Sequence, residues 1–518
     1  MKMKENDKTV YSYHCFILPF MCVSKGIELC SVLNNKNPNN IWKSTDLNIR
    51  NNSLRVIRCD KISQSKGYYD AYKFFNECGR NLVFRDDDSD NVRCFEIRQD
   101  ILHGLQYIIG AFSKEYRLPI LQISVRYYET DIAVMTIICK NEDYCTIDDC
   151  KQINEYGRRL GFPYWPSDDS GGMKCASCLR IENCITGRVL SSDNFLKITD
   201  NSENSDISLS YVSTVIRGLL DCNGLGYRFR AKAVSDKKEI QLKTLLDEKM
   251  FVASLICDRN YCSALCSDYV QNENNFTDKT MRDLLELIRV DLPGKCSVPN
   301  KKEMSEYLNE HLYLTVFSEG NEKLMAVTDQ SCVKLFPEPD YEISFFLHSY
   351  IPLITIPIVQ KYSIIRFQQR IMAFSNHKKK YINSILPREI MTLQQKYVNF
   401  QNQFMPESVT AQMEGSFLYR KLRTVLCVKE ENDYLSSQIG KLFELASIHQ
   451  GNILNKGGLS ISLIAIVFTV FSYFLTSVEL SNIDIHTYGG WPALFVTGLI
   501  ILFVVLIVMI AFRKNDWR

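Results

Sequence analysis

The last sixty residues of this chain contain two uncharged apolar runs, Leu459–Val478 and Trp491–Phe512, separated by a short polar stretch. Each run is long enough to cross a bilayer, because an α-helix rises about 1.5 Å per residue and the hydrocarbon core is roughly 30 Å thick. The pattern therefore predicts two transmembrane helices in a lipid bilayer. Most of the 518 residues precede the first run, so we expect a large soluble part ahead of the membrane.

Basic residues predict the orientation of this hairpin. Lys456 precedes the first run and three basic residues follow the second, whereas the connecting loop has acidic residues and no Lys or Arg. Basic residues are retained on the cytoplasmic side of a membrane. We therefore expect a multi-pass protein of the inner (plasma) membrane with both termini in the cytoplasm.

The two runs differ in polarity. Thr497 is the one hydroxyl residue of the second run, whereas Ser462, Thr469, Ser472 and Thr476 of the first are spaced to fall on one face of a helix. In a ring of subunits, such a face is expected to line a central path, with the second helix outside it. Two alternatives stay open: the hydroxyls bond back to their own helix carbonyls, or the hairpin is only an anchor.

A long helix is expected to lead toward the first run. The segment Glu407–Gly457 has no proline, and its apolar residues, such as Leu435 and Ile439, repeat at helical spacing. Gly457 and Gly458 form a possible joint at the membrane surface. An ordinary packed helix hairpin fits the same pattern.

The chain is expected to have three parts. Residues 1–340 predict a large cytoplasmic sensor domain of mixed α/β (α+β) class, with a possible break near 165–200. A helical stalk over 341–457 follows, and 458–518 forms the transmembrane hairpin with a short cytoplasmic tail. The chain is long enough for two or more packed units ahead of the membrane.

Several segments of the soluble part are typical of strands. Tyr13–Val23 is apolar and follows two lysines, but Pro19 interrupts it and no small-residue cleavage site follows, so we expect a buried strand. Ile120–Tyr128 and Asp131–Cys139 predict a hairpin. Lys249–Cys257 and Leu312–Val327 are also strand-like.

One further apolar run, Ile351–Val359, is not expected to be a third span. It contains Pro352 and Pro357 and stops after nine residues. We expect it to form the start of a buried helix, because helical character begins near Tyr341.

Composition narrows the function classes. The formal net charge of +2 gives no overall signature of direct nucleic-acid binding. The sequence has no glycine-rich loop for phosphate, no zinc-protease helix and no paired nucleophile arrangement. An enzyme is therefore not expected.

Metal binding is weakly indicated. Cys175 and Cys178 form a C-x-x-C with Cys184 nearby, but a zinc site normally has a second close pair at regular spacing. The acidic run 86–90 lacks the alternating oxygens and turn glycine of a calcium loop. Loop cysteines and a solvated acidic turn are the favoured interpretations.

The segment Asn154–Pro166, NEYGRRLGFPYWP, is denser in chemistry. Two adjacent arginines, Arg158 and Arg159, beside glycine, prolines and aromatic residues suit a pocket edge that grips phosphate and stacks a base. Arg228 and Arg230 form a second basic patch on one face of a strand. The alternative for these arginines is structural salt bridging with acidic loops.

The build of the last 170 or so residues resembles the CorA superfamily of pentameric divalent-cation channels, which have a large cytoplasmic domain, a long helix and two C-terminal spans. The family signature Gly-Met-Asn at the outer end of the first span is missing, because the corresponding residues are Thr476–Asn482. Magnesium selectivity is therefore not implied.

Six segments of the chain, in order, carry a second resemblance: Tyr13–Phe20, Asn154–Arg159, Leu246–Phe251, Val327–Ser331, Gln412–Gly415 and Tyr419. With them the soluble part resembles a divergent CorA-like branch, some members of which accompany type III CRISPR systems. This resemblance implies a homo-oligomeric effector, pentameric by family, that is opened by a nucleotide messenger such as an adenylated S-adenosylmethionine (SAM-AMP) and leaks ions in antiviral defence. No cofactor is firmly implied; the messenger is the expected ligand, and a divalent cation is a candidate for the permeating ion.

Under this resemblance, Arg158 and Arg159 are expected to hold the messenger's phosphate. Asp247 is expected to contact a ligand amine or ribose, or to brace the arginines. Two alternatives from other classes stay open: a housekeeping divalent-cation (Mg²⁺) transporter, and a membrane-tethered binding domain without a pore.

Overall fold

The computed structural model is of mixed α/β class and divides into two compact units. The first comprises Met1–Asn376 and Gln395–Ser437, and the second comprises His377–Gln394 and Gln438–Arg518. All described strands belong to the first unit. The structure describes residues 10–23, 29–45, 70–84, 91–111, 114–161, 175–195, 213–230, 238–246, 249–272, 275–298, 300–316, 322–337, 340–375, 386–480 and 498.

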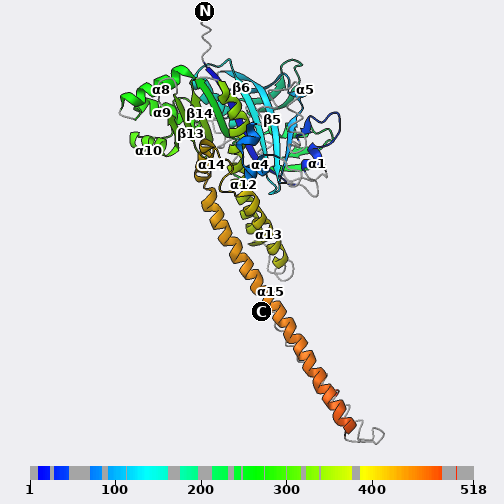
Figure 1. Cartoon of the computed structure of the whole chain (residues 1–518). Coiled ribbons are helices and arrows are strands. Elements are labelled where there is room, and N and C mark those ends of the chain that lie inside the picture. The colour runs from blue at the N-terminus through cyan, green and yellow to red at the C-terminus, as the bar shows by residue number, and fades with distance from the viewer. Residues whose placement is uncertain are drawn as a thin grey trace, which may run out of the picture. The chain divides into compact units, whose positions relative to one another are not determined.

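A large, mostly antiparallel sheet forms the first unit, in the order β12-β13-β14-β11-β1-β6-β5-β4-β7-β8 (Figure 1). β2 pairs with β3, β3 also pairs with β5, and β10 joins β1 to β9. The strands are β1 (Val10–Val23), β2 (Trp42–Ser44), β3 (Val92–Ile97), β4 (Leu105–Gly110), β5 (Glu115–Tyr128), β6 (Ala133–Asn141), β7 (Cys178–Asn183), β8 (Val189–Asn194), β9 (Arg228–Arg230), β10 (Glu239–Lys243), β11 (Phe251–Asp258), β12 (Leu312–Val316), β13 (Lys323–Val327) and β14 (Ser331–Phe336).

The expected strands are confirmed. β1 lies between β6 and β11, antiparallel to both, and its residues from Ser12 to Met21 are buried. A strand covered on both faces has apolar residues in nearly every position. This is why the segment, which follows two lysines, looks like a signal peptide. Pro19 lies beyond the last β11 partner, Ile17, so its missing N–H costs no bond on that side. β5 and β6 form the predicted hairpin.

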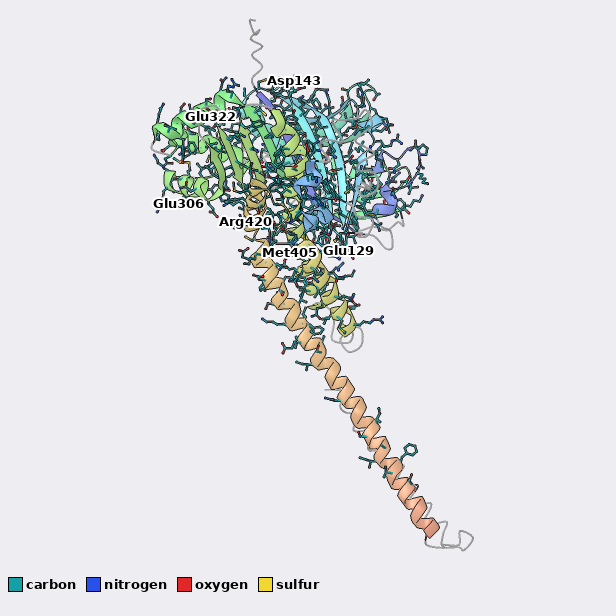
Figure 2. The ribbon with its side chains drawn as sticks, in the orientation of Figure 1. Glu129, Asp143, Glu306, Glu322, Met405 and Arg420 are labelled. Atoms are coloured by element: carbon teal, nitrogen blue, oxygen red, sulfur yellow. The ribbon has the colours of Figure 1, made fainter. Side chains whose placement is uncertain are left out.

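The parallel pair of β11 and β14 lies next to β1, and three helices pack against it. Leu265, Leu284 and Met304, from α8, α9 and α10, share a buried cluster with Val333 of β14. These helices gather at one end of the sheet (Figure 1), and Figure 2 shows Glu306 of α10 and Glu322 there. The helices are α8 (Arg259–Gln271), α9 (Asp278–Arg289) and α10 (Lys301–His311).

After β14 the described chain is helical from Asp340, as predicted, and Ile351–Val359 is buried within α12. Of the described helices, the stretch Ile343–Ala373 is long and apolar enough to cross a membrane, yet most of its apolar window is buried in the fold. A core helix passes the same test, so the prediction of a buried helix is confirmed. The remaining helices before residue 405 are α1 (Leu29–Leu33), α4 (Glu77–Val83), α5 (Gln99–Leu102), α6 (Ile147–Arg158), α7 (Thr214–Asp221), α11 (Asp340–Phe345), the π-helix η2 (Phe346–Tyr350), α12 (Ile351–Ser375) and α13 (Leu386–Phe404).

The expected long helix is two helices, α14 (Met413–Val425) and α15 (Val428–Leu480). They are separated at Cys427, whose φ of 52° lies in the left-handed region. The predicted joint at Gly457 and Gly458 is wrong, because α15 continues through both glycines. The break therefore falls thirty residues earlier than the glycine pair suggested.

The first apolar run, Leu459–Val478, lies wholly within α15. Ser462 and Thr469 donate hydrogen bonds to the carbonyls of Gly458 and Ala465, at 2.9 and 2.8 Å. The back-bonding named as an alternative thus occurs at these two positions, and it is compatible with exposure on a helix face. The second run, apart from Gly498, lies outside the described residues.

Candidate functional site

Helix α6 begins at a capping pair and carries the predicted arginines at its other end. Thr146 accepts a hydrogen bond from the Asp149 backbone N–H at 3.0 Å and donates to the Asp149 carboxylate at 2.9 Å. Such reciprocal caps satisfy the free N–H groups of a first turn. The helix start is therefore fixed, and its last turn presents Arg158 and then Arg159.

A buried polar network anchors the middle of α6 to the sheet. The Asn154 carbonyl oxygen accepts from His14 Nδ1 at 2.7 Å, and its amide donates to Ser254 at 2.9 Å. His14 Nε2 then accepts from the Ser12 hydroxyl at 2.9 Å. Burial lowers the pKa of His14 to about 4, although the bond to Asn154 opposes this shift, so His14 is neutral near pH 7. Asn154 thus sets the rotation of α6 on β1 and β11.

Gly157 lets the last turn of α6 approach the sheet. A Cβ at this position would lie 2.6 Å from Phe16 Cζ, closer than real contacts allow. The Gly157 carbonyl accepts a hydrogen bond from the Tyr107 hydroxyl at 2.8 Å. The glycine in NEYGRR therefore serves close packing, and it holds the adjacent arginines against the sheet.

Arg158 and Arg159 share one carboxylate, Glu155 of the same helix. Arg158 Nε donates to Glu155 Oε2 at 2.8 Å, and Arg159 Nε donates to Oε1 at 2.7 Å. All three side chains are nearly fully buried. Salt bridging is thus present, but its partner is on the same helix rather than in an acidic loop.

Two guanidinium groups share one buried carboxylate, Glu155, and Asp291 acts on Arg158 only through space. Burial lowers the pKa of Arg158 and Glu155 opposes the shift, yet arginine remains protonated in proteins. Arg158 also donates to Gln330 Oε1 at 2.8 Å and to the Val290 carbonyl at 3.3 Å. A buried charge without a full counter-charge is costly, so this position favours an anion.

Backbone contacts join the arginine turn to the segment before β11. Arg159 forms an isolated antiparallel bridge with Lys249, and the Met250 N–H donates to the Arg158 carbonyl at 2.9 Å. Two segments that the resemblance identified, about ninety residues apart, thus meet directly. Asp247, the predicted ligand or brace, lies outside the described residues.

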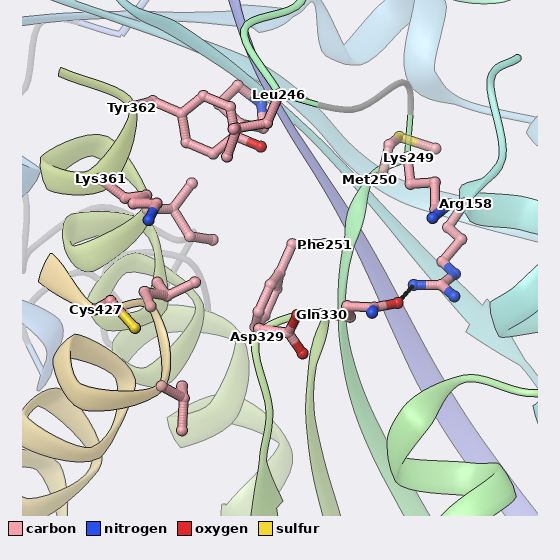
Figure 3. Close-up of a pocket in the computed structure, with 14 residues that line it drawn as sticks. Arg158, Leu246, Lys249, Met250, Phe251, Asp329, Gln330, Lys361, Tyr362 and Cys427 are labelled. Carbon is pink, nitrogen blue, oxygen red and sulfur yellow. Dashed lines mark hydrogen bonds between the residues drawn. The ribbon is translucent and has the colours of Figure 1, made fainter. Parts of the chain in front are cut away.

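A cavity of about 430 Å³ opens beside Arg158 in the first unit. Cavities of this size are typical of small-molecule sites. Figure 3 shows Arg158 and Lys249 on one side, Lys361, Tyr362 and Cys427 on the other, and Phe251 between them. The complete lining is Pro19, Arg158, Leu246, Lys249, Met250, Phe251, Asp329, Gln330, Ile358, Lys361, Tyr362, Val425, Leu426 and Cys427.

Cationic side chains outnumber carboxylates in the described lining. Arg158, Lys249 and Lys361 face the exposed Asp329. Lys361 also forms an ion pair with Glu431, in the first turn of α15. The lining therefore combines positive charge with aromatic and aliphatic surface, which suits an anionic ligand with a flat ring.

The cavity also touches the junction at which α15 begins. Val425 is the last residue of α14, and Leu426 and Cys427 separate it from α15. Cys427 holds the left-handed conformation, which non-glycine residues rarely adopt. A ligand in this cavity would therefore contact both the arginine turn and the junction between α14 and α15.

The cavity lies at the amino-terminal ends of the parallel strands β11 and β14. Lys249 and Met250 precede β11, and Asp329 and Gln330 precede β14. Because these strands run parallel, with Val252 opposite Ser331, the two pairs of residues meet at the same end of the strands. The Val252 N–H donates a hydrogen bond to the Gln330 carbonyl at 3.0 Å, which joins the two segments at this end.

Arg228 and Arg230 do not line this cavity. They lie on β9 on either side of the buried Phe229, as the predicted shared face requires. Arg230 is within 3.7 Å of Asp221 and 3.5 Å of Glu239. The structure therefore brings Arg158 and Arg159 together but keeps this second basic patch apart from them.

The cysteines of the C-x-x-C motif and the nearby Cys184 differ in burial. Cys175 is buried and donates to the Gly161 carbonyl at 3.0 Å, Cys178 begins β7, and Cys184 is exposed. Within the described ranges, no group of three or more His, Cys, Asp or Glu side chains is arranged to hold a metal ion. The acidic run 86–90 lies outside those ranges.

Sequence reasoning missed Gln330, Lys361 and Cys427 as site residues. Gln330 lies within Val327–Ser331, one of the segments on which the resemblance rests. Membership of that segment was the signal that could have identified it. Lys361 lies in α12 and Cys427 in the break between α14 and α15, and in neither segment does anything local distinguish a cavity residue from a surface residue. Their place in the lining depends on how α12 and α14 pack.

Comparison with known proteins identifies no relative. No protein-family model, curated protein or solved structure matches the chain. The resemblance to the CorA-like branch therefore rests on the residues of this chain and stays a prediction.

Proposed function

We propose that this chain is a CorA-like effector of the inner membrane that opens an ion path when its soluble unit binds a nucleotide messenger of the SAM-AMP type. The observation that carries the proposal is the composition of one cavity. It is lined by Arg158 at the end of α6 and also by Val425, Leu426 and Cys427, which end α14 and directly precede α15. One ligand can thus contact a cationic anchor and the junction that leads into the helix containing the first apolar run.

The charge of the lining supports a phosphate-bearing ligand. Arg158 uses three of its roughly five N–H donors on Glu155, Gln330 and Val290. The remaining donors, with the nearby Lys249, are suited to phosphate oxygens. Phe251 and Tyr362 supply flat surfaces for an adenine ring. Arg159 does not line the cavity; it is linked to Arg158 through the Glu155 carboxylate, to which both donate.

The Lys361–Glu431 ion pair supports a route from ligand to helix. Lys361 lines the cavity, and Glu431 lies in the first turn of α15. A ligand phosphate would compete with Glu431 for Lys361, because both are anions. Binding then favours opening only to the extent that the open arrangement binds the messenger more tightly.

In this proposal, the first span lines the path and the second lies outside it. Ser462, Thr469, Ser472 and Thr476 would face the path in a homo-oligomer, for which the family resemblance gives five subunits. Leakage through such a path would halt an infected cell in type III CRISPR defence.

Ion flux through liposomes that contain the full-length protein tests the proposal. We expect flux to appear when SAM-AMP is added and to be absent without it. Magnesium or nickel flux without messenger would instead establish a housekeeping transporter, and no flux under either condition would establish a tethered domain. Either result would overturn the proposal.

Two matched arginine variants locate the messenger site. Arg158→Gln removes a cation from the cavity, whereas Arg228→Gln removes an exposed cation from β9. We expect messenger affinity to fall at least tenfold in the first and to stay unchanged in the second, with thermal unfolding as a check on folding. The reverse result would assign the messenger to the patch on β9.

A further inference from the structure

A second, smaller cavity lies in the first unit between the β5–β6 turn, α12 and α13. Its volume is about 80 Å³, which is room for roughly two or three water volumes. The turn supplies Glu129 and Thr130, next to Phe404 of α13. Figure 2 shows Glu129 and Met405, the residue after α13, near each other. This site shares no lining residue with the cavity of about 430 Å³ beside Arg158, which is the proposed messenger cavity.

Three cations line this small cavity. Arg366 and Arg370 lie one turn apart on α12, and Lys396 lies on α13. Arg370 forms an ion pair with Asp131. Among the described residues, neither Arg366 nor Lys396 has a carboxylate within ion-pair distance. Arg366 is therefore compensated only through space, by Asp131, which is already paired with Arg370, and Lys396 is exposed to solvent.

The Arg366 guanidinium is also incompletely hydrogen-bonded. Its Nε atom is buried and has no hydrogen-bond partner in the part of the chain that the structure describes. Burial lowers the pKa of Arg366, and the neighbouring Arg370 lowers it further. An unpaired donor on a charged group costs more than an unpaired neutral one, so such atoms call for a ligand or ion.

Amide side chains complete the donor set. Asn399 and Gln403 follow Lys396 by three and seven residues on α13, which places all three on one face of the helix. Each amide can donate to an oxyanion. The one carboxylate that lines the cavity, Glu129, is exposed to solvent and is therefore well hydrated.

We propose that this cavity binds a phosphate group, held by Arg366 and Lys396 with Asn399 and Gln403 as additional donors. Guanidinium groups bind phosphate through paired N–H donors, and ammonium groups bind it as point charges. The phosphate comes either from dissolved inorganic phosphate or from the headgroup of an anionic phospholipid such as phosphatidic acid. This inference does not depend on the messenger proposal.

Binding is measured on the full-length protein in phosphatidylcholine nanodiscs. One arm titrates inorganic phosphate by calorimetry at constant ionic strength, with chloride as the control anion. The other arm replaces part of the phosphatidylcholine by phosphatidic acid and measures thermal unfolding. Saturation in the first arm identifies dissolved phosphate, and stabilisation confined to the second identifies the headgroup.

The variants are chosen so that one of them must fold. Arg366→Gln removes the half-buried guanidinium, and Lys396→Gln changes an exposed residue. The matched control is Arg388→Gln, an exposed arginine of α13 that does not line the cavity. We expect each lining variant to weaken the response at least tenfold and the control to leave it unchanged.

Three outcomes overturn the proposal. They are the absence of a response in both arms, an equal response to chloride, and an equal loss in Lys396→Gln and Arg388→Gln. Messenger-dependent flux is measured separately with SAM-AMP in phosphate-free buffer. Loss of phosphate binding with intact messenger binding, or the reverse, therefore separates this site from the messenger site.

Discussion

Gly157 lies so close to Phe16 that a side chain at position 157 would place its Cβ 2.6 Å from the Phe16 ring. Gly157→Ala therefore forces a shift of the last turn of α6, of the Phe16 ring, or of both. We expect this variant to lose about 1–3 kcal/mol of unfolding free energy, as overpacked cores do. Because Arg158 is the next residue, messenger affinity should fall as well, which calorimetry on the full-length protein measures.

Gly440→Ala is the matched control for this change. A Cβ at Gly440, within α15, would meet no atom within 4 Å. We expect it to stabilise the helix by up to about 1 kcal/mol, because alanine has the higher helix propensity. Equal destabilisation by both substitutions would contradict the close approach at Phe16.

His14 predicts a loss of stability in acid. Its pKa is lowered by burial from 6.5 to about 4 in the folded chain. Between these values the unfolded chain binds the extra proton, so stability falls as the pH is lowered from about 6.5 and the loss is complete below about 4. The effect is of the order of 3 kcal/mol.

The measurement is urea unfolding of the full-length protein at several pH values. His14→Gln lacks the titrating ring and should reduce the slope of stability between pH 6.5 and 4. A variant with the same slope as the unmodified protein would show that other groups cause the acid sensitivity.

Glu431 separates ligand binding from transmission. It pairs with Lys361 but does not line the messenger cavity. We expect Glu431→Gln to bind the messenger with nearly unchanged affinity while the flux response changes by about fivefold or more, as a lost coupling of at least 1 kcal/mol would give. Unchanged flux would exclude this ion pair from the route.

Thr469 tests the proposal that the first apolar run lines an ion path. Thr469→Leu removes a hydroxyl that donates to Ala465 and adds bulk to the same helix face. Single-channel recordings should show altered conductance if that face lines the path. Thr497→Leu, in the second run, is the control and should leave conductance unchanged. Equal behaviour of the two variants would favour a simple anchor.

Local pattern was enough to predict much of the fold. The β5–β6 hairpin, the buried strand β1 and the buried start of α12 follow from apolar runs of a given length and from proline positions. The joint at Gly457 was wrong because glycine inside a helix costs only about 1 kcal/mol, which a long helix tolerates. The break at Cys427 has no glycine to signal it.

The candidate site was only partly predictable. Arg158 and Arg159 stand out by composition, but Glu155, which binds both, reads as an ordinary helix residue. The contacts of Arg158 with Gln330 and Val290 join residues more than 130 positions apart. Such proximity depends on sheet order, and no local pattern encodes sheet order.

The parallel pairing of β11 and β14 affects where a site would be sought in related folds. In open α/β sheets, ligands bind beyond the carboxyl ends of parallel strands, which here are Asp258 and Phe336. The cavity lies at the opposite, amino end of both strands, beside Lys249 and Gln330. A search guided by fold class would therefore examine the wrong rim of this sheet, and residues that precede the strands deserve mutagenesis first.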